Sequence, residues 1–273
     1  MNHRMHQRHR GFDMRREFSK EVMGKLVPWL LPIVLLILWQ ILVKLGLLST
    51  RVLPAPSDVI VAGIRLAQTG ELSRNLIIST VRAVIGFLIG GSIGFALGLL
   101  NGIARPAEKA LDTSVQMIRN IPHLALIPLV ILWFGIGEEA KIFLVALGVF
   151  FPIYLNTFHG VRTVDPQLIE MAKSYGLRGW SLFRKVIFPG ALGSILVGVR
   201  YALGIMWLTL IVAETITLDS GIGYMAMNAR EFMQTDVVVL SILMYAILGK
   251  LADSVTRALE KKWLKWNPNY QSV

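Results

Sequence analysis

The side chains that could do chemistry are few in this sequence and stand far apart. The two Gly-Lys pairs, at Gly24 and Gly249, lack the upstream glycine and the following Ser or Thr of a phosphate-binding loop. His123 and His159 each stand alone near the end of an apolar run, which favours packed or interfacial histidines over metal ligands. Cysteine is absent, which excludes disulfides and thiol chemistry. The pattern predicts a chain that hydrolyses no nucleotide itself.

The densest group of charged residues lies at positions 160–189, between two apolar runs. Two acidic residues there face five basic ones, Arg162, Lys173, Arg178, Arg184 and Lys185. Asp165 and Pro166 predict a helix start, and Gly176 predicts its end about three turns later. A second short helix is expected at about 180–188, ending at Pro189. A short amphipathic helix in basic surroundings suits docking to another protein.

The elements around this loop are apolar enough to cross a membrane. Hydrophobic residues make up 54% of the 273 residues and charged residues only 16%, and several apolar runs approach the roughly 20 residues that span a bilayer. Helices satisfy their own backbone in lipid, so an all-α integral membrane protein is expected. The net charge of +11 does not indicate nucleic acid, because the basic residues cluster at span ends, as the positive-inside rule expects.

The apolar runs predict a six-span bundle with both termini in the cytoplasm. We expect a basic cytoplasmic tail at residues 1–26, a first span at 27–47 and an external linker with a short helix at 48–70. Further spans are expected at about 76–100, 121–134, 142–158, 191–213 and 237–259, and a lysine-containing cytoplasmic tail at 257–273. The segment 108–120 is expected to extend the third span, which Pro122 and Pro128 should kink.

Glycines recur every fourth residue in the second span, at Gly86, Gly90, Gly94, Gly98 and Gly102. This spacing places all five along one face of a helix, where the backbone of another helix can approach closely. The pattern predicts a helix-packing seam and not a ligand site.

The basic loop also carries a family pattern: Glu170-Met171-Ala172, then Gly176, then Val186-Ile187-Phe188-Pro189. It resembles the E-A-A, three residues, G, nine residues, I-x-L-P signature of bacterial ABC-importer permeases. The departures at Met171, Val186 and Phe188 are all apolar. The resemblance implies a coupling helix that docks into an ATPase, with coupling residues Glu170, Met171, Ala172, Gly176 and Pro189. The alternative is an ordinary basic cytoplasmic loop.

Two further stretches resemble permeases for nitrate, taurine and alkanesulfonates, most of all those for aliphatic sulfonates. They are Arg119-Asn120-Ile121-Pro122-His123 with Trp133-Phe134-Gly135, and Gly198-Val199-Arg200 with Trp207-Leu208 and Ala213-Glu214. The likeness covers about residues 71–256, which we expect to form a type-I ABC importer permease domain, a six-span bundle.

The resemblance implies an importer in the bacterial inner membrane. Two copies of the chain would pair as a homodimer in the membrane lipid. A cytoplasmic ATPase dimer, which binds the ATP and Mg, would dock below, and a periplasmic substrate-binding protein would deliver substrate from above. The chain itself would then be no enzyme and would need no cofactor or metal of its own.

Arg200 stands about ten residues into the fifth span, some 15 Å from its inner end at helical rise. An intramembrane arginine is unfavourable unless it is paired or faces water. One interpretation is therefore a structural ion pair, although Glu214 lies about four turns away on the same helix. The other is a positive field for a transported anion, with Met206, Trp207 and Glu214 as further pathway residues.

Other functions stay open at this point. Within ABC import, the substrate could be taurine, nitrate or a thiamine precursor. An ion-coupled secondary carrier would need no ATPase. A membrane enzyme is disfavoured, because no catalytic constellation stands out in the sequence.

Overall fold

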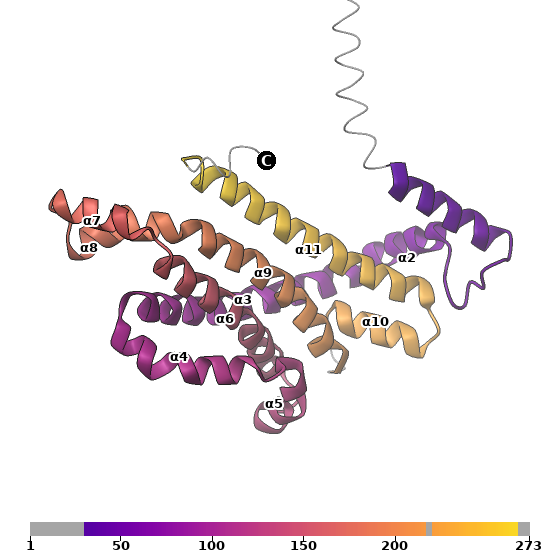
Figure 1. The fold of residues 1–273 in the computed structure, drawn as a ribbon. Helices are drawn as coiled ribbons and strands as arrows, with labels where there is room; N and C mark the ends of the chain where they lie inside the picture. Colours follow the sequence, from indigo (N-terminus) through magenta and orange to yellow (C-terminus); the bar gives the residue numbers. More distant parts are fainter. Residues whose placement is uncertain (1–29, 217–219, 267–273) are drawn as a thin grey trace, which may run out of the picture.

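All regular elements that the computed structural model describes, in residues 30–216 and 220–266, are helices. A helix at Leu30–Lys44 comes first. It is followed by α2 (Pro56–Gln68), α3 (Glu71–Ile103), α4 (Arg105–Arg119), η1 (His123–Leu126), α5 (Ile127–Phe134), α6 (Glu138–Arg162), α7 (Pro166–Ser174), α8 (Gly179–Leu182), η2 (Phe183–Ile187), α9 (Phe188–Ile216), α10 (Ile222–Glu231) and α11 (Thr235–Trp263) (Figure 1). The predicted tail at 1–26 lies outside the described residues.

Four of these elements are long and apolar enough to cross a membrane: α3, α6, α11 and the continuous stretch from α8 to α9. The helices α4 and α5 together form a fifth candidate, bent by 79°, and Leu30–Lys44 is a shorter apolar helix. These segments correspond in position to the six expected spans. The expected all-α membrane bundle is therefore confirmed.

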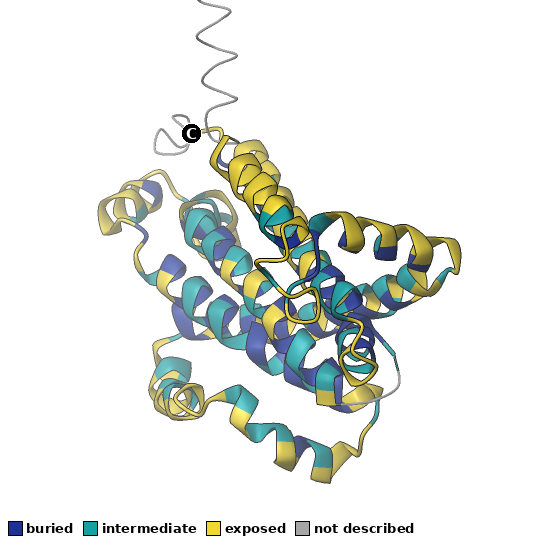
Figure 2. Cartoon of the chain, turned by 90° about the vertical axis from the view of Figure 1, so that its right-hand side faces the viewer, coloured by how far each residue is buried: buried dark blue, intermediate teal, exposed yellow. Residues whose placement is uncertain are grey.

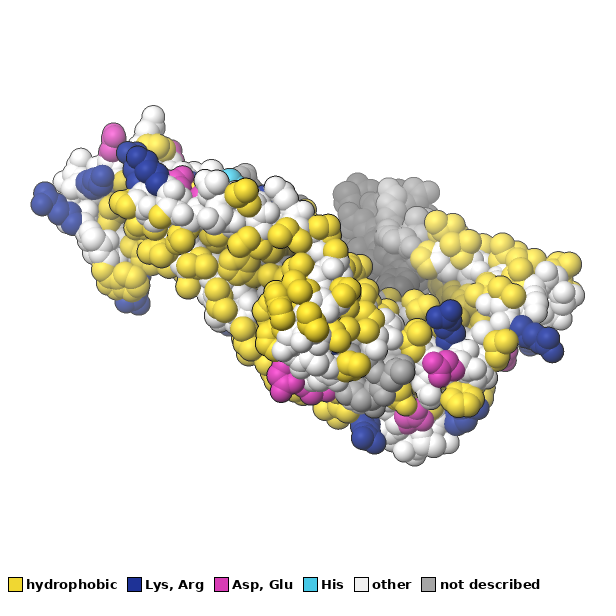
Figure 3. Space-filling model, turned by 90° about the horizontal axis from the view of Figure 1, so that it is seen from below, with side chains coloured by type: hydrophobic (Ala, Val, Ile, Leu, Met, Phe, Trp, Pro, Cys, Tyr) yellow, Lys and Arg dark blue, Asp and Glu magenta, His cyan; other side chains and the backbone are white. Residues whose placement is uncertain are grey.

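The core of the bundle lies along α6, which packs against α3 on one side and α9 on the other. Buried positions gather where these helices meet, whereas their outward faces are exposed (Figure 2). Many exposed side chains are large and apolar, and they cover the middle of the face in Figure 3, with Lys and Arg towards its two ends. Such a band suits contact with lipid or another membrane subunit.

The five regularly spaced glycines of α3 all lie against α6. A Cβ atom at Gly90 would lie 2.0 Å from the carbonyl oxygen of Ala146, and one at Gly94 would lie 2.6 Å from that of Phe150. At Gly86, Gly98 and Gly102 a Cβ would come within 2.6 to 2.8 Å of α6 atoms. The two helix backbones therefore touch along a seam that has no room for a larger side chain.

The third span is broken and not merely extended, which corrects the expectation. The helix α4 ends at Arg119, and the chain then turns through Pro122, whose backbone is extended (φ −60°, ψ 110°). A proline disfavours helix in the residue before it and has no N–H to continue the ladder. Pro128 lies in the first turn of α5, where its missing N–H needs no partner, so it produces no kink.

The helix expected to end at Pro189 instead continues through it. α8, η2 and α9 form one continuous stretch to Ile216, with Pro189 in the first turn of α9. The intervening η2 is a π-helical turn, in which Phe188 N–H bonds to Phe183 O, five residues back. A widened turn relieves the clash that a proline ring otherwise makes with the preceding turn.

Two segments outside the long helices are also packed on the bundle. Within the predicted linker, α2 buries Val59, Ala62 and Leu66 and packs against α11. Between the fifth and sixth spans, α10 buries Ile222 and Met225 against the core formed by α9 and α11. Both therefore belong to the folded domain and are not free loops.

Candidate coupling surface and buried ion pairs

The helix α7 has the start and the end that the sequence predicted. The Asp165 carboxylate accepts a hydrogen bond from Gln167 N–H (2.8 Å), and Pro166 is the first helical residue. At the other end Gly176 adopts φ +82°, and Leu177 N–H reaches back to Ala172 O (3.0 Å). Local capping thus fixes α7 as a separate short helix between α6 and α8.

The helix α7 and the residue that follows it carry exposed apolar side chains. Leu168, Met171 and Tyr175 are exposed, Tyr175 by 80%, whereas Ala172 is buried. In Figure 1, α7 and α8 form the left-hand end of the molecule, far from α5 and α10. Exposed apolar residues on a projecting helix are typical of a surface that another protein covers.

A groove of about 780 Å³ runs beside α7. Leu168, Met171 and Ala172 line it from α7, and Tyr175 lines it from directly beyond the end of that helix. Lys185 and Pro189 line it from the start of the fifth span, and Trp266 lines it from beyond the end of α11. The predicted coupling residues Met171, Ala172 and Pro189 therefore share this groove. Glu170 lies on the exposed surface of α7, and Gly176 terminates that helix.

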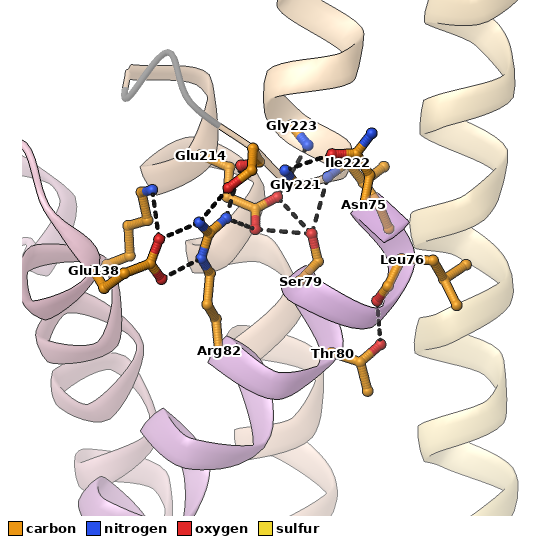
Figure 4. Close-up of polar contacts among 12 residues, drawn as sticks. Asn75, Leu76, Ser79, Thr80, Arg82, Glu138, Glu214, Gly221, Ile222 and Gly223 are labelled. Atoms are coloured by element: carbon orange, nitrogen blue, oxygen red, sulfur yellow. Dashed lines mark hydrogen bonds and ion pairs between the residues drawn. The ribbon is translucent and has the colours of Figure 1, made fainter. Parts of the chain in front are cut away.

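A buried ion-pair cluster ties the other ends of the long helices together (Figure 4). Arg82 of α3 donates two hydrogen bonds to Glu138 at the start of α6, and its Nη1 donates to Glu214 Oε1 near the end of α9 (2.9 Å). It also donates to the carbonyl oxygen (2.7 Å) and hydroxyl (2.8 Å) of Ser220. One guanidinium therefore holds three helices and the segment before α10.

Glu214 is fully buried, and protein groups surround its carboxylate. Besides Arg82, it accepts hydrogen bonds from the Ser79 hydroxyl (2.8 Å), the Tyr245 hydroxyl (2.9 Å) and Gly223 N–H (3.0 Å). Ser79 Oγ in turn accepts from Ile222 N–H (2.9 Å). These contacts dock the start of α10 on α3. They place the predicted pathway residue Glu214 in the packed interior.

Arg200 pairs with α11 and not with Glu214. Its guanidinium contacts Glu260 and lies 3.7 Å from Asp253 Oδ1. Asp253 also pairs with Arg257 (2.8 Å) and Lys250 (3.7 Å) on its own helix. This geometry favours the structural interpretation of Arg200. Its partners lie on α11, so the sequence of α9 alone does not indicate them.

Met206 and Trp207 lie in the packed core of the chain. Both belong to the cluster formed by α2, α3, α6, α9, α10 and α11, and the indole of Trp207 lies edge-on to Tyr245, 6.3 Å between ring centres. The two predicted pathway residues are thus buried, whereas Arg200 contacts carboxylates of α11.

Arg82 was not among the predicted site residues, although the signal that singled out Arg200 applies to it. Arg82 is a charged residue inside the apolar run of the second span, where a partner is required. His123 is a packed histidine, as expected, with Nε2 3.0 Å from Thr209 Oγ1. Across residues 30–216 and 220–266, no group of three or more His, Asp and Glu side chains could hold a metal ion.

The comparisons with known proteins agree with this architecture. The family model described as the inner membrane component of binding-protein-dependent transport systems matches residues 86–265. The chain is 62% identical to the putative aliphatic sulfonates transport permease protein SsuC of Escherichia coli (strain K12), over 92% of this chain and 95% of that protein. It is 45% identical to the protein of the same name from Bacillus subtilis (strain 168), over 94% of each.

A more distant relative is the taurine transport system permease protein TauC of Escherichia coli (strain K12), 35% identical over 87% of this chain and 88% of that protein. Among solved structures, a chain from the crystal structure of an amino acid ABC transporter with histidines superimposes with a TM-score of 0.61, at 17% identity over 74% of this chain and 97% of that one. This likeness supports the fold. Since the family model covers most of the chain and these relatives match almost its full length, the chain belongs to the family of inner membrane components of binding-protein-dependent transport systems.

Proposed function

We propose that this chain is the permease subunit of an ATP-driven importer that carries aliphatic sulfonates across the bacterial inner membrane. The substrate class rests on one observation, the 62% identity to a relative that is named for that transport, over 95% of the relative's length. Taurine remains the second candidate, because the permease of that name is 35% identical to the chain.

The energy for transport would come from a separate ATPase dimer, which binds ATP and Mg and docks at α7. The support is geometric: α7 projects from the bundle, exposes an apolar face and stands in basic surroundings. A second copy of the chain would complete the pathway, and a periplasmic binding protein would deliver the substrate. The positive-inside rule orients the α7 end and both termini towards the cytoplasm.

Movement of α7 has a short route into the bundle. Three residues, 163–165, separate α7 from α6, and residues 175–178 separate it from α8, which continues into α9. Because α6 is locked to α3 by the glycine seam, closure of the ATPase dimer would displace α3, α6 and α9 together. This is a bistable helix bundle that a partner biases at one end.

Uptake by reconstituted vesicles tests the proposal. The chain is combined with its ATPase and binding protein. Entry of labelled ethanesulfonate, taurine and nitrate is then measured with and without ATP on the side of the membrane where the ATPase docks. We expect ATP-dependent uptake that is fastest for ethanesulfonate. Uptake without the ATPase would indicate a secondary carrier, and faster uptake of taurine or nitrate would overturn the sulfonate assignment.

A further inference from the structure

The groove beside α7 has a wall that comes from the far end of the chain. Trp266 lies beyond the end of α11 and lines the groove together with α7 residues that precede it by about 95 positions. Its place is fixed by neighbours: Leu264 is almost fully buried, Leu264 N–H bonds to Glu260 O (2.9 Å), and the Trp266 indole N–H donates to Trp263 O (3.1 Å). Trp266 as a residue is nevertheless 56% exposed.

The chemistry of the groove indicates what would cover it. Its lining is mostly apolar, with the aromatic side chains Tyr175 and Trp266 on different elements. Residues 166–190 around it hold four basic side chains and one acidic side chain, Glu170. Burial of aromatic residues commonly dominates the affinity of an interface, and charge complementarity at the rim adds specificity. An apolar protrusion flanked by acidic residues is the matching partner surface.

We infer that Trp266 is a docking residue for the cytoplasmic ATPase, so that the coupling surface is a two-walled groove and not the α7 helix alone. This inference rests on the proposed function. It has a mechanical consequence, because α11 then receives the push of the ATPase directly. The ion pair of Arg200 with Glu260 joins α11 to α9, so both helices would follow the ATPase as one body.

A different role would also expose a tryptophan at this place. Trp and Tyr gather at membrane–water interfaces, where they anchor helices to the headgroup region. Trp263 provides the matched control for this alternative. It lies one turn earlier on α11, is exposed to a similar extent (47%), and does not line the groove. An anchoring role would apply to both tryptophans, whereas a docking role applies to Trp266.

The affinity of the full-length permease for its ATPase tests the inference. Purified permease is immobilised, the ATPase is titrated, and the dissociation constant is compared for the wild type, Trp266→Ala, Trp266→Phe and Trp263→Ala. We expect Trp266→Ala to weaken binding about tenfold, Trp266→Phe to restore most of it, and Trp263→Ala to stay within about twofold of the wild type. Equal effects of the two alanine variants would overturn the docking role in favour of a membrane anchor.

A labelling experiment tests the docking role of Trp266 without relying on a measured loss of affinity for the ATPase. Because the chain has no cysteine, Trp266→Cys and Trp263→Cys each offer one thiol to a maleimide. The ATPase should protect position 266 and leave position 263 reactive. If the ATPase binds the permease but leaves position 266 as reactive as before, the inference is wrong while the proposed function stands. If wild-type permease binds no ATPase, the proposed function fails first.

Discussion

Arg200 lies on α9 with carboxylates of α11 beside its guanidinium, and this neighbourhood favours a structural role. The Glu260 side chain is only 10% exposed and that of Arg200 38%. A carboxylate so placed needs its cation, because an unpaired charge in a low-dielectric region is strongly unfavourable. We therefore regard Arg200 as a positioning residue that ties α9 to α11.

Arg200→Gln should lower the free energy of unfolding by about 1–3 kcal/mol, since it leaves Glu260 without its partner. The double variant Arg200→Gln/Glu260→Gln should recover part of that loss. Denaturation of the purified permease in detergent provides the measurement. If Arg200→Gln is as stable as the wild type but imports poorly, the arginine contributes to the substrate pathway instead.

Glu214 carries a second prediction at this scale. Glu214→Gln keeps the shape of the side chain but removes its charge, and it places an amide N–H₂ among four hydrogen-bond donors. We expect a loss of about 3–5 kcal/mol in unfolding free energy. Glu139→Gln, at an exposed carboxylate, should change it by less than about 0.5 kcal/mol. Equal stability of the two variants would contradict the structural role of the cluster.

Residue patterns predicted local features well and distant partners poorly. Asp165, Pro166 and Gly176 act on the backbone within one turn, so their effect on α7 could be predicted from the sequence. Arg82 and Glu214 are 132 positions apart, and nothing in the spacing of either residue indicates the other. Their pairing follows from how α3 and α9 pack, which local propensity does not determine.

At the scale of elements, the closest contact made by a glycine in the described residues lies between α3 and α6, where a Cβ atom at Gly90 would lie 2.0 Å from a backbone oxygen. The repeat of four residues predicted which face of α3 is involved, but not that α6 is its partner. The bend between α4 and α5 was predicted only as a kink, because a proline shows where a helix is interrupted and not the direction that the chain takes afterwards.

Gly90→Ala tests the seam with the smallest possible change. The added Cβ would lie 2.0 Å from a backbone oxygen of α6, so the helices must separate, and we expect about 1–3 kcal/mol of destabilisation. Gly249→Ala on α11 is the control, because nothing lies within 4 Å of its Cβ position, and it should be neutral or slightly stabilising. The yield of monodisperse protein after mild heating compares them. A Gly90→Ala variant that survives heating as well as the control would argue against close packing.

At the scale of the whole molecule, composition and charge predicted the class, an all-α membrane bundle, whereas four or five helices of the described residues, and not six, are long and apolar enough to count as spans. The expected orientation follows from the basic residues near α7 and the acidic Glu138 and Glu139 at the start of α6. Composition and charge do not indicate the substrate, so the proposal of aliphatic sulfonates rests on the identity to a relative named for their transport.

Cysteine labelling tests the orientation in a chain without background thiols. Single cysteines in place of Ala110 and Tyr175 should react only after the membrane is made permeable. Cysteines in place of Gly137 and Glu139 should react with an impermeant maleimide in intact cells. Labelling of position 175 from the outside would invert the arrangement and remove α7 from any cytoplasmic partner.

The most direct test of the central claim, that α7 couples this permease to an ATPase, is sulfonate-stimulated ATP hydrolysis by the reconstituted complex. Gly176 adopts φ +82° with nothing within 4 Å of its Cβ position, so Gly176→Val strains only the backbone at the end of α7. Asparagine tolerates that conformation, so Gly176→Asn is the control. We predict that Gly176→Val reaches the membrane but loses about tenfold or more of the stimulation, while Gly176→Asn keeps most of it. Full stimulation in Gly176→Val would contradict the claim.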